Sequence, residues 1–187
     1  MKEIIKALDN QPIVQINGYG FIINPLTEQI PATSAELLKD ACHELAECVD
    51  KTRTTKLVAE EDKGAILLAG VSWITGLPFG IARWQPNGLS SQIKQSFKME
   101  YKHGDIYLNG IEPKDKVTII DDMVSTGGTI IALIKTIEKI GAEIIDIICV
   151  AEKMNYGGVS SIKKNTGYNV KTLLKIDVGG EKSKIII

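Results

Sequence analysis

The sequence predicts an α/β protein with a central, mostly parallel sheet flanked by helices. Short apolar segments at 56–59, 79–84, 116–120 and 144–150 alternate with segments of helical periodicity. Strands that alternate with helices of about a dozen residues favour a parallel sheet, because right-handed crossovers place the helices on both of its faces. Ligands of such sheets bind beyond the carboxyl ends of the strands, where we expect the functional site.

The first 49 residues are predicted to form a small N-terminal hood followed by a helix. Residues 1–8 suit a short helix, and residues 13–23 contain two glycines among apolar residues, which suits a bent strand pair or hairpin. In 34–49, apolar residues then recur at helical spacing. Thr33 and Glu36 form a capping box ahead of that segment, which predicts a helix with one buried face.

Two further helices are predicted by their apolar content and by their stop signals. Residues 65–75 are followed by Gly76, and residues 129–140 are followed by Gly141. Glycine directly after a helix takes the left-handed conformation that ends it. Each of these helices therefore connects two of the predicted strands.

The chain, residues 1–187, has the length of a single domain, and no repeat or linker-like segment divides it. Lys and Arg number 22 against 23 Asp and Glu, for a net charge of −1, so no basic excess favours nucleic acid or an acidic membrane surface. Cys42, Cys48 and Cys149 lack the spacing of a zinc site. Apolar runs too short to span a bilayer, and charges in the first ten residues, lead us to expect a cytoplasmic protein.

One polar segment lies between the predicted strand at 116–120 and the predicted helix at 129–140. Its residues are Ser125, Thr126, Gly127, Gly128 and Thr129. A strand-to-helix turn exposes backbone N–H groups at the positive end of the helix dipole, the glycines let these groups converge, and the hydroxyls add donors. The segment is therefore expected to bind a phosphate without a lysine.

Two carboxylates, Asp121 and Asp122, directly precede that turn. They would repel a phosphate, but they can accept hydrogen bonds from two ribose hydroxyls one step away. The alternative is an aspartate that caps a turn closed by the glycines. The chain has no Gly-Lys-Ser/Thr loop and no GxGxxG motif at the first strand, so the common nucleotide-binding loops are set aside.

These residues carry a resemblance to a known family. Residues 117–129, Val-Thr-Ile-Ile-Asp-Asp-Met-Val-Ser-Thr-Gly-Gly-Thr, resemble the signature of the type I phosphoribosyltransferases. The resemblance implies the fold of that family and a phosphoribosyltransferase activity with phosphoribosyl pyrophosphate as donor. It also implies that the turn holds the 5-phosphate and the aspartates hold the ribose.

Residues 59–64, Ala-Glu-Glu-Asp-Lys-Gly, are similar to the Gly-Ile-Glu-Ala-Arg-Gly turn of the adenine branch, with Lys63 at the arginine position. For Glu60, an exposed charged turn is the alternative. The branch often has an Arg-Lys pair where this chain has Arg83 and Trp84, and Lys94 or Lys98 could replace the missing cation. The resemblance assigns five residues to the pyrophosphate: Glu61, Asp62, Lys63, Gly64 and Arg83.

Residues 96–101, Ser-Phe-Lys-Met-Glu-Tyr, are similar to a mobile-loop segment of the same branch, Ser-Tyr-Glu-Leu-Glu-Tyr. Residues 85–96 are rich in Pro, Gly, Ser, Asn and Gln, so we expect a flexible excursion able to close over substrate. The resemblance places Glu100 near the imidazole edge of the incoming base and gives catalytic roles to Glu100, Asp121 and Asp122. Mg²⁺ is expected to enter with the substrate.

The identity of the base stays open between adenine and a 6-oxopurine. Residues 21–27 resemble the corresponding stretch of archaeal hypoxanthine-guanine enzymes placed within the adenine branch. Phe21 and Ile23 could equally pack the N-terminal part onto the sheet. Two other functions remain as alternatives: a regulatory protein that senses the donor or a nucleotide without turnover, and another sugar-phosphate enzyme. The family resemblance also implies a homodimer.

Overall fold

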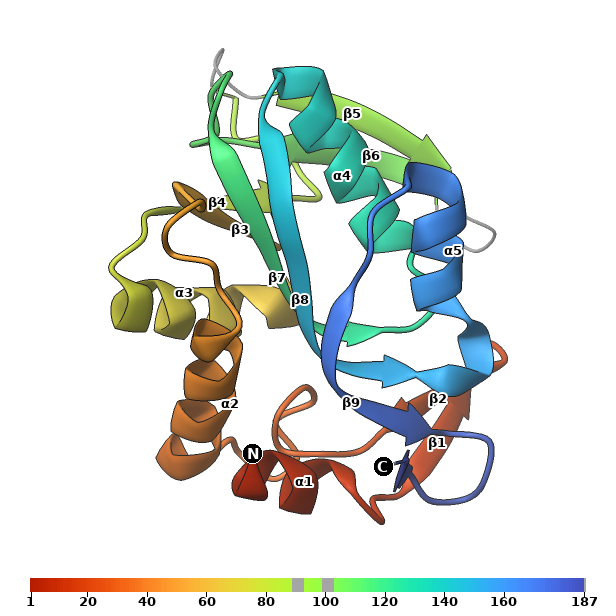
Figure 1. Cartoon of the computed structure of the whole chain (residues 1–187). Helices are drawn as coiled ribbons and strands as arrows, with labels where there is room; N and C mark the ends of the chain where they lie inside the picture. The colour runs from red at the N-terminus through yellow and green to blue at the C-terminus, as the bar shows by residue number, and fades with distance from the viewer. Residues whose placement is uncertain (89–92, 99–102, 187) are drawn as a thin grey trace.

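The computed structural model describes residues 1–88, 93–98 and 103–186 (Figure 1). The helical elements are α1 (Lys2–Leu8), α2 (Ala35–Glu47), α3 (Lys63–Thr75), α4 (Gly128–Ile140), the 3-10 turn η1 (Met154–Tyr156) and α5 (Gly158–Thr166). The strands are β1 (Ile13–Ile16), β2 (Tyr19–Ile22), β3 (Lys56–Glu60), β4 (Phe79–Arg83), β5 (Ile93–Lys98), β6 (His103–Leu108), β7 (Lys116–Val124), β8 (Glu143–Lys153), β9 (Lys171–Asp177) and β10 (Lys184–Ile186). Across these described residues, no helix is long and apolar enough to cross a membrane.

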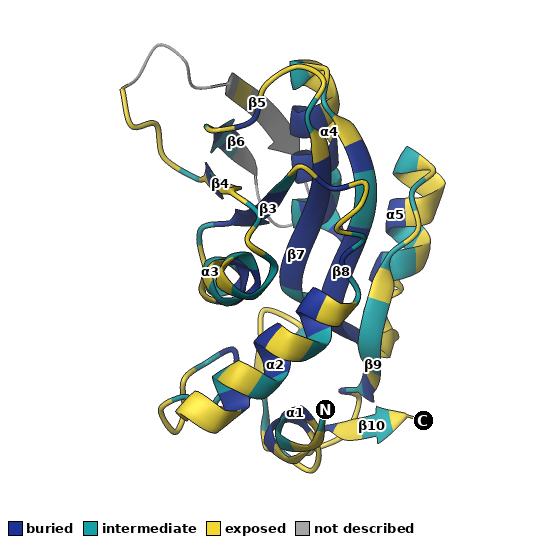
Figure 2. Ribbon diagram, turned by 60° about the vertical axis from the view of Figure 1, so that its left-hand side comes forward, coloured by how far each residue is buried: buried dark blue, intermediate teal, exposed yellow. Residues whose placement is uncertain are grey.

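The main sheet has eight strands in the order β10-β9-β8-β7-β3-β4-β6-β5. The five strands from β9 to β4 run parallel, whereas β10 at one edge and β6 and β5 at the other pair antiparallel. This confirms the predicted mostly parallel sheet. Its central strands β7 and β8 are buried along most of their lengths (Figure 2), as expected where helices cover both faces of a parallel sheet.

Two hydrophobic cores lie on opposite faces of this sheet. One joins α1, α2 and α3 to the sheet and includes Ile120 and Ile148, whereas the other joins α4 and α5 to it and includes Ile119 and Ile147. Neighbouring residues of β7 and β8 thus belong to different cores, because successive side chains of a strand point to opposite faces. The apolar strands are consequently fixed between two helical layers.

The helices begin and end close to their predicted bounds. Gly76 and Gly141 end α3 and α4 in the left-handed conformation, as predicted. The predicted capping box of α2 is wrong by one residue: the Ser34 Oγ accepts a hydrogen bond from the Leu37 N–H at 3.2 Å. The Thr33 hydroxyl instead donates to the Pro25 carbonyl at 2.5 Å, which ties the preceding loop to the start of the helix.

The predicted flexible excursion is partly a strand. Residues 93–98 form β5, an edge strand that pairs antiparallel with β6 over six residue pairs, so 93–96 belong to the sheet along one side. The composition of 85–96, with its turn-forming residues, did not predict this strand because it lacks a clear alternation of apolar residues. Residues 89–92 of this segment lie outside the described part of the chain.

Residues 9–33, called the hood here, lie at the carboxyl ends of the parallel strands (Figure 1). Its hairpin pairs β1 with β2, as expected from residues 13–23. The Tyr156 hydroxyl accepts a hydrogen bond from the Gly20 N–H at 2.5 Å, and the Tyr19 and Tyr156 rings lie 5.4 Å apart. The hood is thus held against the segment that follows β8, far away in the sequence.

Candidate active site

The turn expected to bind a phosphate joins a strand to a helix, as its sequence predicts. Strand β7 ends at Val124, and α4 begins at Gly128 behind Gly127, which takes a φ of 82°. A Cβ on Gly127 would lie 2.8 Å from the Gly158 carbonyl oxygen, so both the conformation and the space require glycine. Because Gly127 has no side chain to cap α4, the first N–H groups of the helix are available to an anion.

Asp121 and Asp122 lie in β7, near its carboxyl end, and not in the loop that follows it. Asp121 is 7% exposed, and Asp122 is half-buried. Burial, and then repulsion from Asp122 and Glu60, raise the pKa of the Asp121 carboxyl well above its usual range. Burial also raises the pKa of Asp122. The two carboxyls therefore repel each other at a partly buried position, where hydrogen-bond donors such as sugar hydroxyls would stabilise them.

The turn after β3 approaches Asp121 closely. A Cβ on Gly64 would lie 2.9 Å from an Asp121 carboxylate oxygen, so a larger residue at this position of α3 would displace that carboxylate. Glu60 is 8% exposed and accepts a hydrogen bond from the Trp84 indole N–H at 3.0 Å. Burial raises the pKa of Glu60. The solvated-turn alternative for Glu60 is thus wrong, because its carboxyl lies inside the site.

The residues expected at the pyrophosphate divide into two groups. Asp62 and Lys63 line the cavity of the site, whereas the cavity lining does not include Glu61 or Arg83, which pair with each other at 3.3 Å. Glu61 also accepts a hydrogen bond from the Trp84 N–H at 2.7 Å. Trp84, at the position of the family's second cation, thus connects β4 to the turn through hydrogen bonds instead of supplying positive charge.

These elements enclose a cavity of about 440 Å³ at the carboxyl edge of the sheet. Its lining includes the two aspartates and the turn 125–129, and also Ile16, Tyr19 and Phe21 of the hood. Glu60 and Trp84 also line it. The predicted phosphate and sugar positions therefore share a cavity with an aromatic and apolar wall, which suits a planar base. Glu100, the predicted catalytic acid or base, lies outside the described residues.

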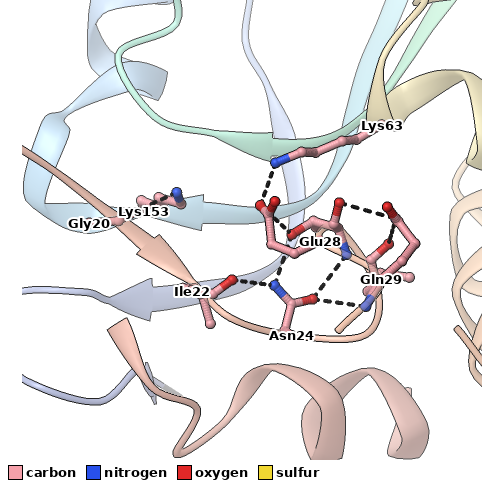
Figure 3. A network of polar contacts seen from close by, with 9 residues as sticks. Gly20, Ile22, Asn24, Glu28, Gln29, Lys63 and Lys153 are labelled. Carbon is pink, nitrogen blue, oxygen red and sulfur yellow. Dashed lines mark hydrogen bonds and ion pairs between the residues drawn. The ribbon is translucent and has the colours of Figure 1, made fainter. Parts of the chain in front are cut away.

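Lys153 is a site residue that the sequence analysis missed. It ends β8, is 9% exposed, and lines the cavity. Its Nζ donates to the Gly20 carbonyl at 3.0 Å (Figure 3). The same Nζ lies 5.1 Å from the centre of the Phe21 ring. Burial lowers the pKa of Lys153 despite the nearby charge of Asp122. The available signal was a cation at the carboxyl end of an apolar strand next to the strand with the aspartates.

The cavity combines a strand-to-helix turn suited to an anion, two carboxyls suited to hydroxyls and an apolar wall. An α/β protein with such a site fits the class of enzymes that act on a phosphorylated sugar and a planar group. The chain belongs to the phosphoribosyltransferase family, since the family model described as phosphoribosyl transferase domain matches residues 34–178. It is therefore an enzyme of the phosphoribosyltransferase type.

Sequence similarity to curated relatives extends over nearly the whole chain. The hypoxanthine/guanine phosphoribosyltransferase of Methanococcus voltae is 38% identical, over 95% of this chain and 94% of its own length. The protein of the same name from Methanocaldococcus jannaschii is 39% identical, over 97% of this chain and 98% of its own length. The N-terminal hood is thus included in the likeness.

Solved structures that superpose on this chain are named for adenine, unlike the sequence relatives. Adenine phosphoribosyltransferase from Thermoanaerobacter pseudethanolicus superposes with a TM-score of 0.79 at 22% identity, over 93% of this chain and 98% of its own. Adenine phosphoribosyltransferase from Rhodothermus marinus has a TM-score of 0.75 at 26% identity, over 93% and 97%. The fold is therefore that of the adenine branch, as the sequence motifs predicted, while the sequence relatives have the hypoxanthine/guanine name.

Proposed function

We propose that the chain transfers the 5-phosphoribosyl group of phosphoribosyl pyrophosphate to a 6-oxopurine, hypoxanthine or guanine. The products are the nucleoside 5′-monophosphate and pyrophosphate. The names of the methanogen relatives support this choice of base, and the position of Lys153 supports it independently. Adenine is the alternative, because the structural neighbours have that name.

Lys153 is the observation that carries the choice of base. Its buried ammonium has three donors and no acceptor, and it lies beside the Phe21 ring on the hood side of the cavity. A 6-oxopurine presents a carbonyl oxygen that accepts from such a donor, whereas adenine presents an amino group at the same position. A site with a buried donor discriminates strongly against a ligand that leaves the donor unpaired.

We assign the donor to the remaining groups of the site. The 5-phosphate binds the turn formed by Ser125, Thr126, Gly127, Gly128 and Thr129. Asp121 and Asp122 accept hydrogen bonds from the ribose hydroxyls. The pyrophosphate lies toward Glu61, Asp62, Lys63, Gly64 and Arg83, and of the two cations in this set Lys63 is the one that lines the cavity.

The chemistry breaks the bond from C1′ to the pyrophosphate oxygen and forms a bond from C1′ to N9 of the base. Positive charge develops on the ribose ring, and a carboxylate of the Asp121–Asp122 pair stabilises it electrostatically when it is ionised. Glu100 would take the N9 proton as the new bond forms. Mg²⁺ is proposed to enter with the donor, since its pyrophosphate and ribose oxygens are ligands of the kind that Mg²⁺ prefers.

We also propose that the enzyme acts in the cytoplasm as a homodimer. Trp73 is 88% exposed and Ile66 is 48% exposed. They are seven residues apart, so they share one outer face of α3. No charged residue follows Lys63 in this helix, and a second copy would cover the apolar face. Sedimentation of the wild type and of Trp73→Ser tests this, and a monomeric wild type would contradict it.

The activity is tested by incubating the protein with phosphoribosyl pyrophosphate and Mg²⁺ together with adenine, hypoxanthine, guanine, xanthine or orotate in turn. Nucleotide products are separated by chromatography. We expect inosine and guanosine monophosphates as the main products. Product with adenine alone would overturn the choice of base, and no product with any base would overturn the proposed function.

A further inference from the structure

The pyrophosphate-side lysine is already neutralised by a residue of the hood. The Lys63 Nζ forms an ion pair with the Glu28 carboxylate, which lies 35 residues away in the sequence (Figure 3). Both side chains are about one quarter exposed, at 26% and 24%. The lysine therefore lines the cavity while its charge points toward the hood.

The loop that presents Glu28 is fixed by the buried Asn24. The Asn24 amide donates to the Ile22 carbonyl and to the Thr27 hydroxyl, each at 2.8 Å, and its oxygen accepts from the N–H groups of Leu26 and Thr27 at 2.9 and 3.0 Å. Asn24 is fully buried and Thr27 is 3% exposed. A satisfied buried network of this kind holds one conformation. Glu28 is thus presented from a fixed position.

Lys63 needs a counter-ion for two reasons. It is the first residue of α3, where the positive end of the helix dipole disfavours a cation. The second reason is burial, which by itself would lower the pKa of Lys63. The hydrogen bond to Glu28 and the charges of Asp122, Glu28 and Asp62 outweigh burial, so the pKa of Lys63 is raised. The Nζ also lies 5.9 Å from the centre of the Phe21 ring. These contacts keep the ammonium charged and hold it on the hood side.

We propose that Glu28 is a positioning residue that holds Lys63 against the hood and competes with the pyrophosphate of the donor for its charge. The inference rests on the proposed function, because it takes pyrophosphate as the ligand of Lys63. Donor binding then exchanges one anionic partner of Lys63 for another. Glu28 loses its counter-ion in that step, while the Asn24 network keeps the loop that carries it in place.

Arg83, the other cation expected at the pyrophosphate, has a more exposed ion pair than Lys63 has. Arg83 pairs with Glu61 at 3.3 Å, and its side chain is 47% exposed. An exposed pair is screened by water and contributes little free energy. The half-buried pair of Lys63 and Glu28 is screened less, and therefore costs more to exchange.

The test measures binding of phosphoribosyl pyrophosphate and of inorganic pyrophosphate by calorimetry, each with Mg²⁺, to the wild type and to E28Q, E28A and E28D. E143Q is the matched control, because Glu143 pairs with Arg53 at 3.8 Å on an exposed surface. Melting curves establish that each variant is folded. The same measurements on K63M and on the double variant E28Q/K63M show whether the effect of Glu28 passes through Lys63.

We expect E28Q and E28A to lower the dissociation constant of both ligands by roughly threefold to tenfold, the effect of one partly screened charge pair. The KM for the donor falls in parallel, whereas E28D and E143Q remain within about twofold of the wild type. The effect of E28Q is absent in the K63M background. Unchanged or weaker binding in both E28Q and E28A overturns the proposal, and so does an effect of E28Q that persists without Lys63. If the wild type binds neither ligand, the proposed function itself fails.

Discussion

Replacing Lys153 with methionine should separate recognition of the base from binding of the donor. Methionine has nearly the length of the lysine stem and removes the donors. The variant loses the 3.0 Å hydrogen bond to the Gly20 carbonyl, but it also removes a charge whose burial is unfavourable, as the lowered pKa of Lys153 indicates. These effects oppose each other, so we expect little change in the melting temperature.

The expected loss of activity follows from the burial of this side chain. Lys153 is 9% exposed, so water competes poorly for its donors. A hydrogen bond to a charged group contributes about 1.5–3 kcal/mol, which corresponds to a loss of roughly tenfold to 150-fold in kcat/KM for hypoxanthine and guanine. The affinity for phosphoribosyl pyrophosphate should remain within about threefold, because the donor does not need this contact.

The assay is steady-state kinetics with each base at saturating donor, together with calorimetric titration of the donor alone. Lys175 is an exposed residue of the adjacent strand β9, so Lys175→Met controls for the loss of a lysine. A fall in donor affinity equal to the fall in kcat/KM would assign Lys153 to the donor. Unchanged kinetics with both 6-oxopurines would remove it from the site.

Three further predictions concern the donor side and the scaffold. In Asp121→Asn, a carboxyl whose pKa is raised by burial and by its acidic neighbours is removed. Since the folded wild type retains a proton that the unfolded chain loses, its stability falls as pH rises through the raised pKa, so the variant should melt higher than wild type at pH 8. Its melting temperature should no longer rise with the donor, and a lower melting point would contradict the assignment. Gly127→Ala should lose donor binding and about 2–4 kcal/mol of stability in denaturant titrations, because its φ is 82° and a Cβ meets the Gly158 oxygen at 2.8 Å. Ser34→Ala should cost about 1 kcal/mol of unfolding free energy without affecting activity, whereas Thr33→Ala should not uncap α2.

The sequence predicted the parts of the fold in which local pattern and tertiary structure agree. Strands β7 and β8 are apolar because both of their faces are buried, and α3 and α4 end at glycines that adopt positive φ. Strand β5 was missed, because the hydrogen bonds that stabilise it come from β6 and not from its own composition. Ser34 rather than Thr33 caps α2 since Thr33 bonds the loop before it, a contact that no local pattern contains.

The same distinction applies to the site. Residues 121–129 lie together in sequence and in space, so the motif could predict that they belong to one site. Lys153 and Glu28 reach the site from separate segments, and their positions depend on how the hood packs against the end of β8. The motif assigned Arg83 a cation's role, but its pairing with Glu61 across the turn depends on tertiary structure. Contacts between distant segments were therefore the part that the sequence did not predict.

A crystal structure of the protein with guanosine 5′-monophosphate tests the central claim most directly. We predict that the phosphate accepts hydrogen bonds from the backbone N–H groups of 126–129, and that the ribose hydroxyls donate to Asp121 and Asp122. The O6 of guanine should lie about 3 Å from the Lys153 Nζ, with the base against Phe21. A phosphate bound elsewhere, or a base that leaves Lys153 bonded to the Gly20 carbonyl alone, would contradict the account.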